Sequence, residues 1–160
     1  MTASQPRTAS LLIDDQLCFA LYTASRAMTG RYRGLLDDLN LTYPQYLVML
    51  VLWEEGTITV NQLGRRLLLD SGTLSPLLKR LESAGFVTRR RRVEDERSVE
   101  IGLTEAGVRL RDTAESVPGR LCEIVRIPYD ERAVLIDTLR RLTVTLVEDD
   151  ERRSPAPWGE

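Results

Sequence analysis

Two short helical patterns followed by two short strand patterns constrain the fold of this chain more than any other feature. Thr59 opens the first helical pattern, and Asp70 or Ser71 opens the second. A tight turn joins the two patterns, which therefore predict a helix-turn-helix. Residues 86–91 and 98–103 predict two strands around a polar, charged tip. Helix, turn, helix and hairpin together predict a winged helix.

Amphipathic helices are predicted on both sides of this unit. Before it, apolar residues at helical spacing predict one helix of about 25 residues that starts near Ile13. Thr42 caps the next helix, which stops near Gly56. After the hairpin, Thr104 caps a fifth helix that Pro118 should kink, and a sixth follows. The flanking helices exceed what a small monomer needs, so we expect them to form a dimerisation layer.

The length of 160 residues predicts one domain with a core large enough to fold without disulfides or metals. Its predicted fold class is mainly α with a small β-hairpin wing, as a winged helix-turn-helix with a helical dimerisation layer. The predicted parts are flexible tails at residues 1–10 and 148–160, a domain over 11–147, a winged helix over about 42–103, and dimerisation helices over about 11–40 and 104–147.

Composition excludes several classes of function. The chain has no histidine, which removes histidine-based acid–base catalysis and zinc sites, and its two cysteines cannot close a zinc site alone. We therefore predict no metal and no cofactor. No apolar run approaches the length of a membrane span, and no signal peptide is apparent, so we expect a cytoplasmic protein with no membrane partner.

Basic and hydroxyl side chains gather in the second helical pattern and in the hairpin. The net charge is only −2, but seven basic and four acidic side chains lie between Lys79 and Arg97. Recognition helices present their N-terminal residues to base edges, and a two-fold dimer matches a palindromic operator in double-stranded DNA. A merely solvated surface, or a winged helix used for protein contacts, remains the alternative. The candidate DNA-binding residues are Ser71, Thr73, Ser75, Pro76, Lys79, Arg80, Arg89, Arg91, Asp95 and Arg97.

Four segments resemble a known family in the right order: Q-L-C-F-A-L-Y, L-T-Y-P-Q-Y, D-S-G-T-L-S-P-L-L-K-R-L-E and E-D-E-R-S-V, the last with a D-x-R pair in the wing. They resemble the organic hydroperoxide resistance regulators (OhrR), a branch of the MarR class of bacterial repressors, over roughly residues 11–147. The resemblance implies an α-helical dimer with one winged helix per subunit. It also implies that Cys18 senses organic hydroperoxides and that Tyr32 and Tyr43 donate hydrogen bonds to its sulfur.

The spacing of Cys18 and Tyr32 constrains how such a sensor is built. They are 14 residues apart, which is about 21 Å along a continuous helix, so they cannot meet within one chain. An antiparallel partner subunit could bring them together, and we expect a pocket shared across the dimer interface. Its apolar wall is predicted from Phe19, Leu21 and Tyr22.

The role of Cys122 stays open on sequence alone. The resemblance admits members in which a second cysteine in the fifth helix forms a disulfide with the oxidised sensor, and others in which a small thiol caps it. The two-cysteine type is the favoured interpretation, with the disulfide between subunits. A packed helix residue is the alternative for either cysteine.

These features predict a peroxide-sensing repressor whose reduced homodimer binds operator DNA and is released when Cys18 is oxidised. The alternative is a MarR-type repressor relieved by a non-covalent aromatic ligand. A thiol peroxidase is disfavoured because the chain has neither a C-x-x-C pair nor an apparent catalytic arginine beside Cys18, so we predict no enzyme activity.

Overall fold

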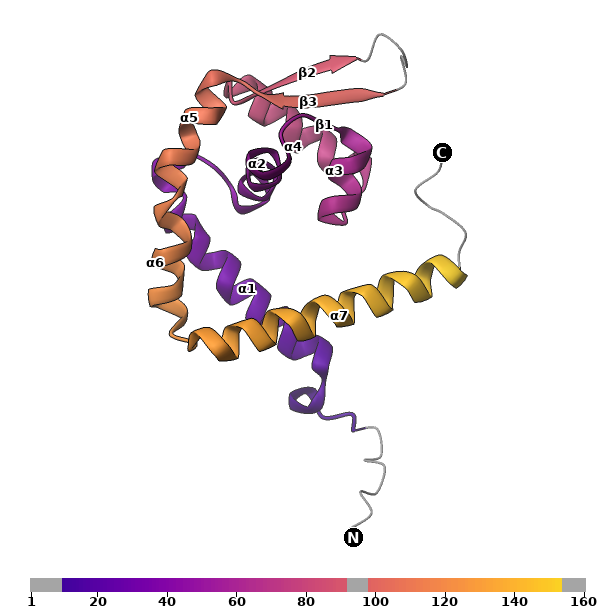
Figure 1. The fold of residues 1–160 in the computed structure, drawn as a ribbon. Coiled ribbons are helices and arrows are strands. Elements are labelled where there is room, and N and C mark those ends of the chain that lie inside the picture. Colours follow the sequence, from indigo (N-terminus) through magenta and orange to yellow (C-terminus); the bar gives the residue numbers. More distant parts are fainter. Residues whose placement is uncertain (1–9, 92–97, 154–160) are drawn as a thin grey trace.

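The computed structural model describes residues 10–91 and 98–153, which fold into helices around a small antiparallel sheet (Figure 1). Of the predicted N-terminal tail, the structure describes only Ser10. Of the predicted C-terminal tail, it describes residues 148–153. In chain order the elements are η1 (Ile13–Asp15), α1 (Leu17–Leu35), η2 (Asp37–Leu39), α2 (Tyr43–Glu55), β1 (Ile58–Thr59), α3 (Val60–Leu67), α4 (Ser71–Ser83), β2 (Val87–Arg91), β3 (Val99–Leu103), α5 (Glu105–Ala114), α6 (Ser116–Val125) and α7 (Tyr129–Arg153).

The predicted winged helix is confirmed in α3, α4 and the β2–β3 hairpin. Side-chain caps fix where its helices begin: Thr59 accepts a hydrogen bond from the Gln62 N–H at 3.2 Å, and Asp70 accepts one from Thr73 at 2.8 Å. The sequence missed β1, which pairs with β3 and makes the sheet three-stranded in the order β1-β3-β2.

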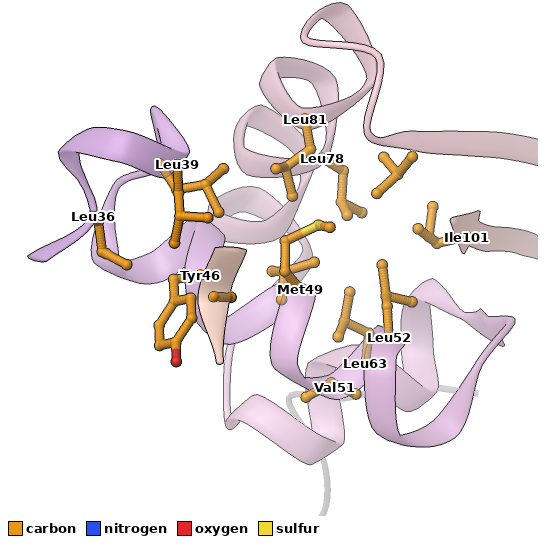
Figure 2. Close-up of a cluster of buried hydrophobic side chains, with 14 of the residues drawn as sticks. Leu36, Leu39, Tyr46, Met49, Val51, Leu52, Leu63, Leu78, Leu81 and Ile101 are labelled. Atoms are coloured by element: carbon orange, nitrogen blue, oxygen red, sulfur yellow. The ribbon is translucent and has the colours of Figure 1, made fainter. Parts of the chain in front are cut away.

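The core lies where α2 meets α3, α4 and the sheet (Figure 2). Leu74, Leu78 and Leu81 of α4 are buried as predicted, and Leu77 is half-buried. They pack in one cluster with Met49 of α2, and apolar burial of this kind is the main favourable contribution to folding. α4 is therefore held to the rest of the chain by its apolar face, and its opposite face is exposed.

The first long helix is shorter than predicted. Residues Ile13–Asp15 form a separate 3₁₀ turn, Gln16 is extended with φ −87° and ψ 116°, and α1 begins only at Leu17. The apolar spacing continues across this break, which is why periodicity alone did not reveal it. Cys18 consequently lies in the first turn of α1 and not in the interior of a helix.

The fifth helix divides in two. α5 ends at Ala114 and α6 begins at Ser116, with Pro118 in its first turn. A proline ring inside a helix clashes with the carbonyl four residues earlier, here that of Ala114, so the predicted kink occurs as a break. At the other end, α7 continues through Arg153, and residues 148–153 are helical where a flexible tail was expected.

Within the single chain, α7 projects from the end of α6 and leaves much of its apolar surface uncovered (Figure 1). Val134, Leu135 and Leu146 are exposed on α7, as are Leu11 and Leu17 near the start of α1. No helix among the described residues is both long and apolar enough to cross a membrane. These uncovered faces indicate a contact surface for another molecule.

Candidate nucleic-acid interface and thiol site

The N-terminal half of α4 presents small polar side chains to solvent. Ser71, Ser75 and Pro76 are exposed, as are Lys79 and Arg80 further along the helix. The pattern is that of a helix whose buried stripe leaves one polar face available for a ligand.

Thr73 and Asp70 form the N-cap of α4 as a pair. The Thr73 hydroxyl donates a hydrogen bond to the Asp70 carboxylate at 2.8 Å, and the Thr73 N–H donates another at the same distance. These hydrogen bonds lower the pKa of Asp70 below its ordinary value. The Thr73 hydroxyl therefore already has a hydrogen-bond partner within the described part of the chain, unlike the hydroxyls of Ser71 and Ser75 on the same helix.

The start of α4 and the hairpin border one shared hollow of about 230 Å³. Ser71, Ser75 and Arg89, all predicted to bind DNA, line it together with Thr59 and Asn61 from the start of α3. The guanidinium of Arg89 lies 3.9 Å from the Glu82 carboxylate of α4, which orients it along the helix. Arg91 is exposed at the end of β2, and the predicted Asp95 and Arg97 lie outside the described residues.

The two predicted tyrosines meet in one aromatic cluster. The ring centroids of Tyr32 and Tyr43 are 4.4 Å apart, and those of Tyr32 and Tyr46 are 5.9 Å apart. Burial raises the pKa of Tyr32 to about 12, with smaller contributions from Tyr43, Tyr46 and Cys122. Burial also raises the pKa of Tyr43. Both phenols therefore stay protonated at physiological pH and can donate hydrogen bonds to an anion.

Cys122 lies beside this cluster. α6 packs against α1, and the thiol is close enough to Tyr32 to act on its ionisation. The Arg132 guanidinium, from the first turn of α7, donates a hydrogen bond to the Cys122 sulfur. The thiol, the phenols and one cation thus form a group where α1, α2, α6 and the start of α7 meet.

Cys18 lies apart from the tyrosines. It is the second residue of α1, exposed, and separated from Tyr32 by 14 residues of continuous helix, about 21 Å. The free N–H groups of a helix start favour an anion there, whereas Asp14 and Asp15 oppose it. One chain therefore carries the two parts of the predicted sensor at opposite ends of one helix.

The predicted apolar wall does not form a closed pocket in one chain. Phe19 and Leu21 are half-buried, while Tyr22 is exposed. The hydroxyl of Tyr22 accepts a hydrogen bond from Arg26 at 3.1 Å, and the Arg26 guanidinium lies over its ring. The residues that the structure describes leave Cys18 exposed.

A second hollow, of about 440 Å³, lies between α2 and the α5–α6 junction. Its apolar lining includes Tyr46, Leu50, Trp53 and Pro118, and its charged lining is Arg111, Glu54 and Glu115. Residues that the sequence did not single out thus include Trp53 and Arg111 here, Asn61 at the hollow by α4, and Arg132 beside Cys122. No cluster of metal-ligating side chains occurs within the described ranges.

Comparison with known proteins reveals one group of relatives. Residues 41–99 match a family model described as the MarR family. Over 134 residues the chain is 49% identical to the organic hydroperoxide resistance transcriptional regulator of Bacillus subtilis (strain 168). The matched region covers 84% of this chain and 91% of that protein.

Two solved structures of AbfR, a Staphylococcus epidermidis protein, are also similar. Reduced AbfR bound to DNA has 38% sequence identity and a TM-score of 0.71, covering 84% of this chain and 94% of AbfR. AbfR with its disulfide formed has 37% sequence identity and a TM-score of 0.61, and the match covers 85% of this chain and 92% of AbfR.

Proposed function

Because this chain belongs to the MarR family of transcriptional regulators, we propose that it is a repressor whose reduced homodimer binds a palindromic operator and leaves it when an organic hydroperoxide oxidises Cys18. Family membership agrees with the expectation that the chain is a regulator and not an enzyme. The organic hydroperoxide signal draws on the relative from Bacillus subtilis, which is named for resistance to such compounds.

DNA binding is supported by the free polar face of α4 and by Arg89 and Arg91 of the hairpin. AbfR, of similar fold, has been solved on DNA. In a two-fold dimer each α4 enters the major groove of one half-site, and the half-sites lie about 34–36 Å apart. Ser71 and Ser75 can then reach base edges, while the arginines contact the phosphates.

One observation carries the sensor proposal: Tyr32, Tyr43 and Cys122 lie together, while Cys18 lies at the far end of α1. Apolar side chains at the start and in the middle of α1 and along α7 are uncovered in the single chain. A partner subunit packed antiparallel on these faces brings Cys18 of one subunit to the tyrosines of the other. Each dimer then has two complete sites, each built from both chains.

In such a site, the tyrosines and Cys122 of the partner subunit assist the oxidation of Cys18. The Cys18 thiolate attacks the outer oxygen of the hydroperoxide, an S–O bond forms and the O–O bond breaks. The hydroperoxide proton ends on the departing alkoxide, so the products are a sulfenate and an alcohol, and the sulfenate takes up a proton from water to become the sulfenic acid. Protonated tyrosines donate hydrogen bonds to the thiolate before attack and to the sulfenate after it. Cys122 of the partner subunit, or a small thiol, then displaces hydroxide from the sulfenic sulfur to form a disulfide.

Release of DNA follows because the disulfide joins α1 of one subunit to α6 of the other. Shifting a dimer from almost wholly binding-competent to almost wholly incompetent requires about 5.5 kcal/mol of differential stabilisation. α6 connects to the winged helix through α5, whose Gly107 carbonyl accepts a hydrogen bond from Trp53 of α2 at 2.9 Å. Movement of α6 therefore changes the spacing of the two recognition helices.

Fluorescence anisotropy on the upstream DNA of the regulator's own gene tests this function. One equivalent of cumene hydroperoxide should release the wild-type dimer, while Cys18→Ser should bind the same DNA and stay bound. Binding by both proteins that survives peroxide would contradict the thiol switch.

The second candidate is a repressor relieved by an aromatic ligand, and the hollow lined by Trp53 and Arg111 favours it. A phenolic compound suits an apolar wall that has a few polar and charged side chains beside it. Release of Cys18→Ser from DNA by such a compound, and not by peroxide, would support this candidate.

A further inference from the structure

The contact between Arg132 and Cys122 has no part in the function proposed so far. The guanidinium of Arg132 donates a hydrogen bond to the Cys122 sulfur, although the two residues belong to different helices. A reversal of the chain places them together: α6 ends at Val125, the following residue Arg126 has φ 54°, and α7 starts at Tyr129. The pairing therefore depends on the turn and not on helical spacing.

A second contact holds the guanidinium in place. It lies 5.3 Å from the ring centroid of Tyr129, in the same first turn of α7. A cation over an aromatic ring is attracted by the electrons of the ring face. The Arg132 guanidinium thus contacts the Tyr129 ring and the Cys122 sulfur.

We propose that Arg132 is a positioning residue that holds Cys122 ready to close the disulfide with Cys18 of the partner subunit. This inference rests on the proposed function and on the two-cysteine form of it. Thiolates, not thiols, attack sulfur, and an adjacent arginine stabilises a thiolate. A hydrogen bond from a cation is also stronger when its acceptor is an anion.

The step that Arg132 assists is the closure of the disulfide between Cys122 and Cys18. The Cys122 thiolate attacks the sulfenic sulfur of Cys18, the S–S bond forms, the S–O bond breaks, and hydroxide leaves and takes up a proton to become water. The hydroperoxide supplied the oxidising equivalent in the preceding step, so no further oxidant is needed. Rapid closure protects the sulfenic acid from a second peroxide, which would convert it irreversibly to sulfinic acid.

The test compares Arg132→Gln, Arg132→Lys and, as the matched control, Arg140→Gln, an exposed arginine on the same helix. Each dimer receives one equivalent of cumene hydroperoxide and is quenched with a thiol-blocking reagent. Non-reducing gels then give the rate of covalent dimer formation, and mass spectrometry gives the rate of Cys18 oxidation.

Arg132→Gln should slow covalent dimer formation about tenfold, the effect of losing one charge-assisted hydrogen bond, and Cys18 sulfenic acid should accumulate. Arg132→Lys should recover part of the rate, and Arg140→Gln should equal the wild type. Cys18 oxidation and the DNA affinity of the reduced dimers should be unchanged in all three.

Two results would overturn the role of Arg132 and leave the proposed function intact. One is disulfide closure in Arg132→Gln at the wild-type rate. The other is an equal loss of DNA affinity and helical circular dichroism in both Arg132 variants, which would make the residue structural. Failure of the wild type to oxidise Cys18 at all would instead reject the proposed function.

Discussion

Tyr32 is partly buried against the rings of Tyr43 and Tyr46, and its burial has a direct chemical consequence. A phenol with a pKa of about 12 remains a hydrogen-bond donor throughout the physiological range. This property suits a group that must stabilise a thiolate and then a sulfenate without losing its own proton.

The raised pKa of Tyr32 also predicts how stability depends on pH. Because the folded-state pKa, about 12, exceeds the ordinary value of 10.0, this contribution is fully present below pH 10 and is lost as pH rises toward 12. Urea denaturation between pH 8 and pH 12 should show a steeper alkaline loss of unfolding free energy in the wild type than in Tyr32→Phe. Parallel curves for the two proteins would contradict the assignment.

At individual residues, sequence reasoning found the members of the site but not all of their partners. Tyr32 and Tyr43 were identified through a family resemblance, and the structure brings their rings together. Arg132 was missed because it meets Cys122 only through a left-handed turn at Arg126, which neither periodicity nor composition indicates. The roles of these residues remain predictions.

At the level of elements, local capping chemistry made the winged helix predictable. Asp70 and Thr104 each lie at the helix start that their residue type indicated. Elements that depend on distant partners were not predictable. The two-residue strand β1 exists only because Ile58 and Thr59 pair with β3, and the start of α1 at Leu17 interrupts an apolar pattern that continues across it.

Gly107 allows α5 to approach the hairpin closely. We therefore expect a methyl group added at this position to have a large effect on the free energy of unfolding. A Cβ at this position would lie 2.0 Å from the Phe86 carbonyl oxygen, which itself accepts a hydrogen bond from the Thr104 N–H at 3.0 Å. Gly107→Ala should lower the free energy of unfolding by about 2 kcal/mol or more, because α5 must move away.

The matched control is Gly30→Ala in the interior of α1, where an added Cβ meets nothing within 4 Å. That substitution should raise the free energy of unfolding by about 0.5–1 kcal/mol, since glycine weakens a helix interior. Urea denaturation of both variants measures the difference. Equal small effects would show that α5 and the hairpin are not held as closely as described.

At the scale of the whole molecule, the single chain has a completed DNA-binding unit and an uncompleted helical layer. The winged helix encloses its own core, whereas α7 and the start of α1 leave apolar side chains uncovered. The thiol site is divided in the same way, with Cys18 at one end of α1 and the tyrosines and Cys122 at the other. A second copy of the chain completes both the layer and the site.

The most direct test of this shared site mixes two variant subunits that each lack one of the two cysteines. Cys18→Ser and Cys122→Ser chains, one carrying a mass tag, are exchanged into heterodimers, treated with one equivalent of cumene hydroperoxide and run on a non-reducing gel. Neither variant alone has both sulfurs, so neither should form a disulfide between Cys18 and Cys122. The mixture should form a covalent heterodimer joining Cys18 of one chain to Cys122 of the other. A wild-type disulfide that forms within one chain, with no covalent species in the mixture, would contradict the shared site.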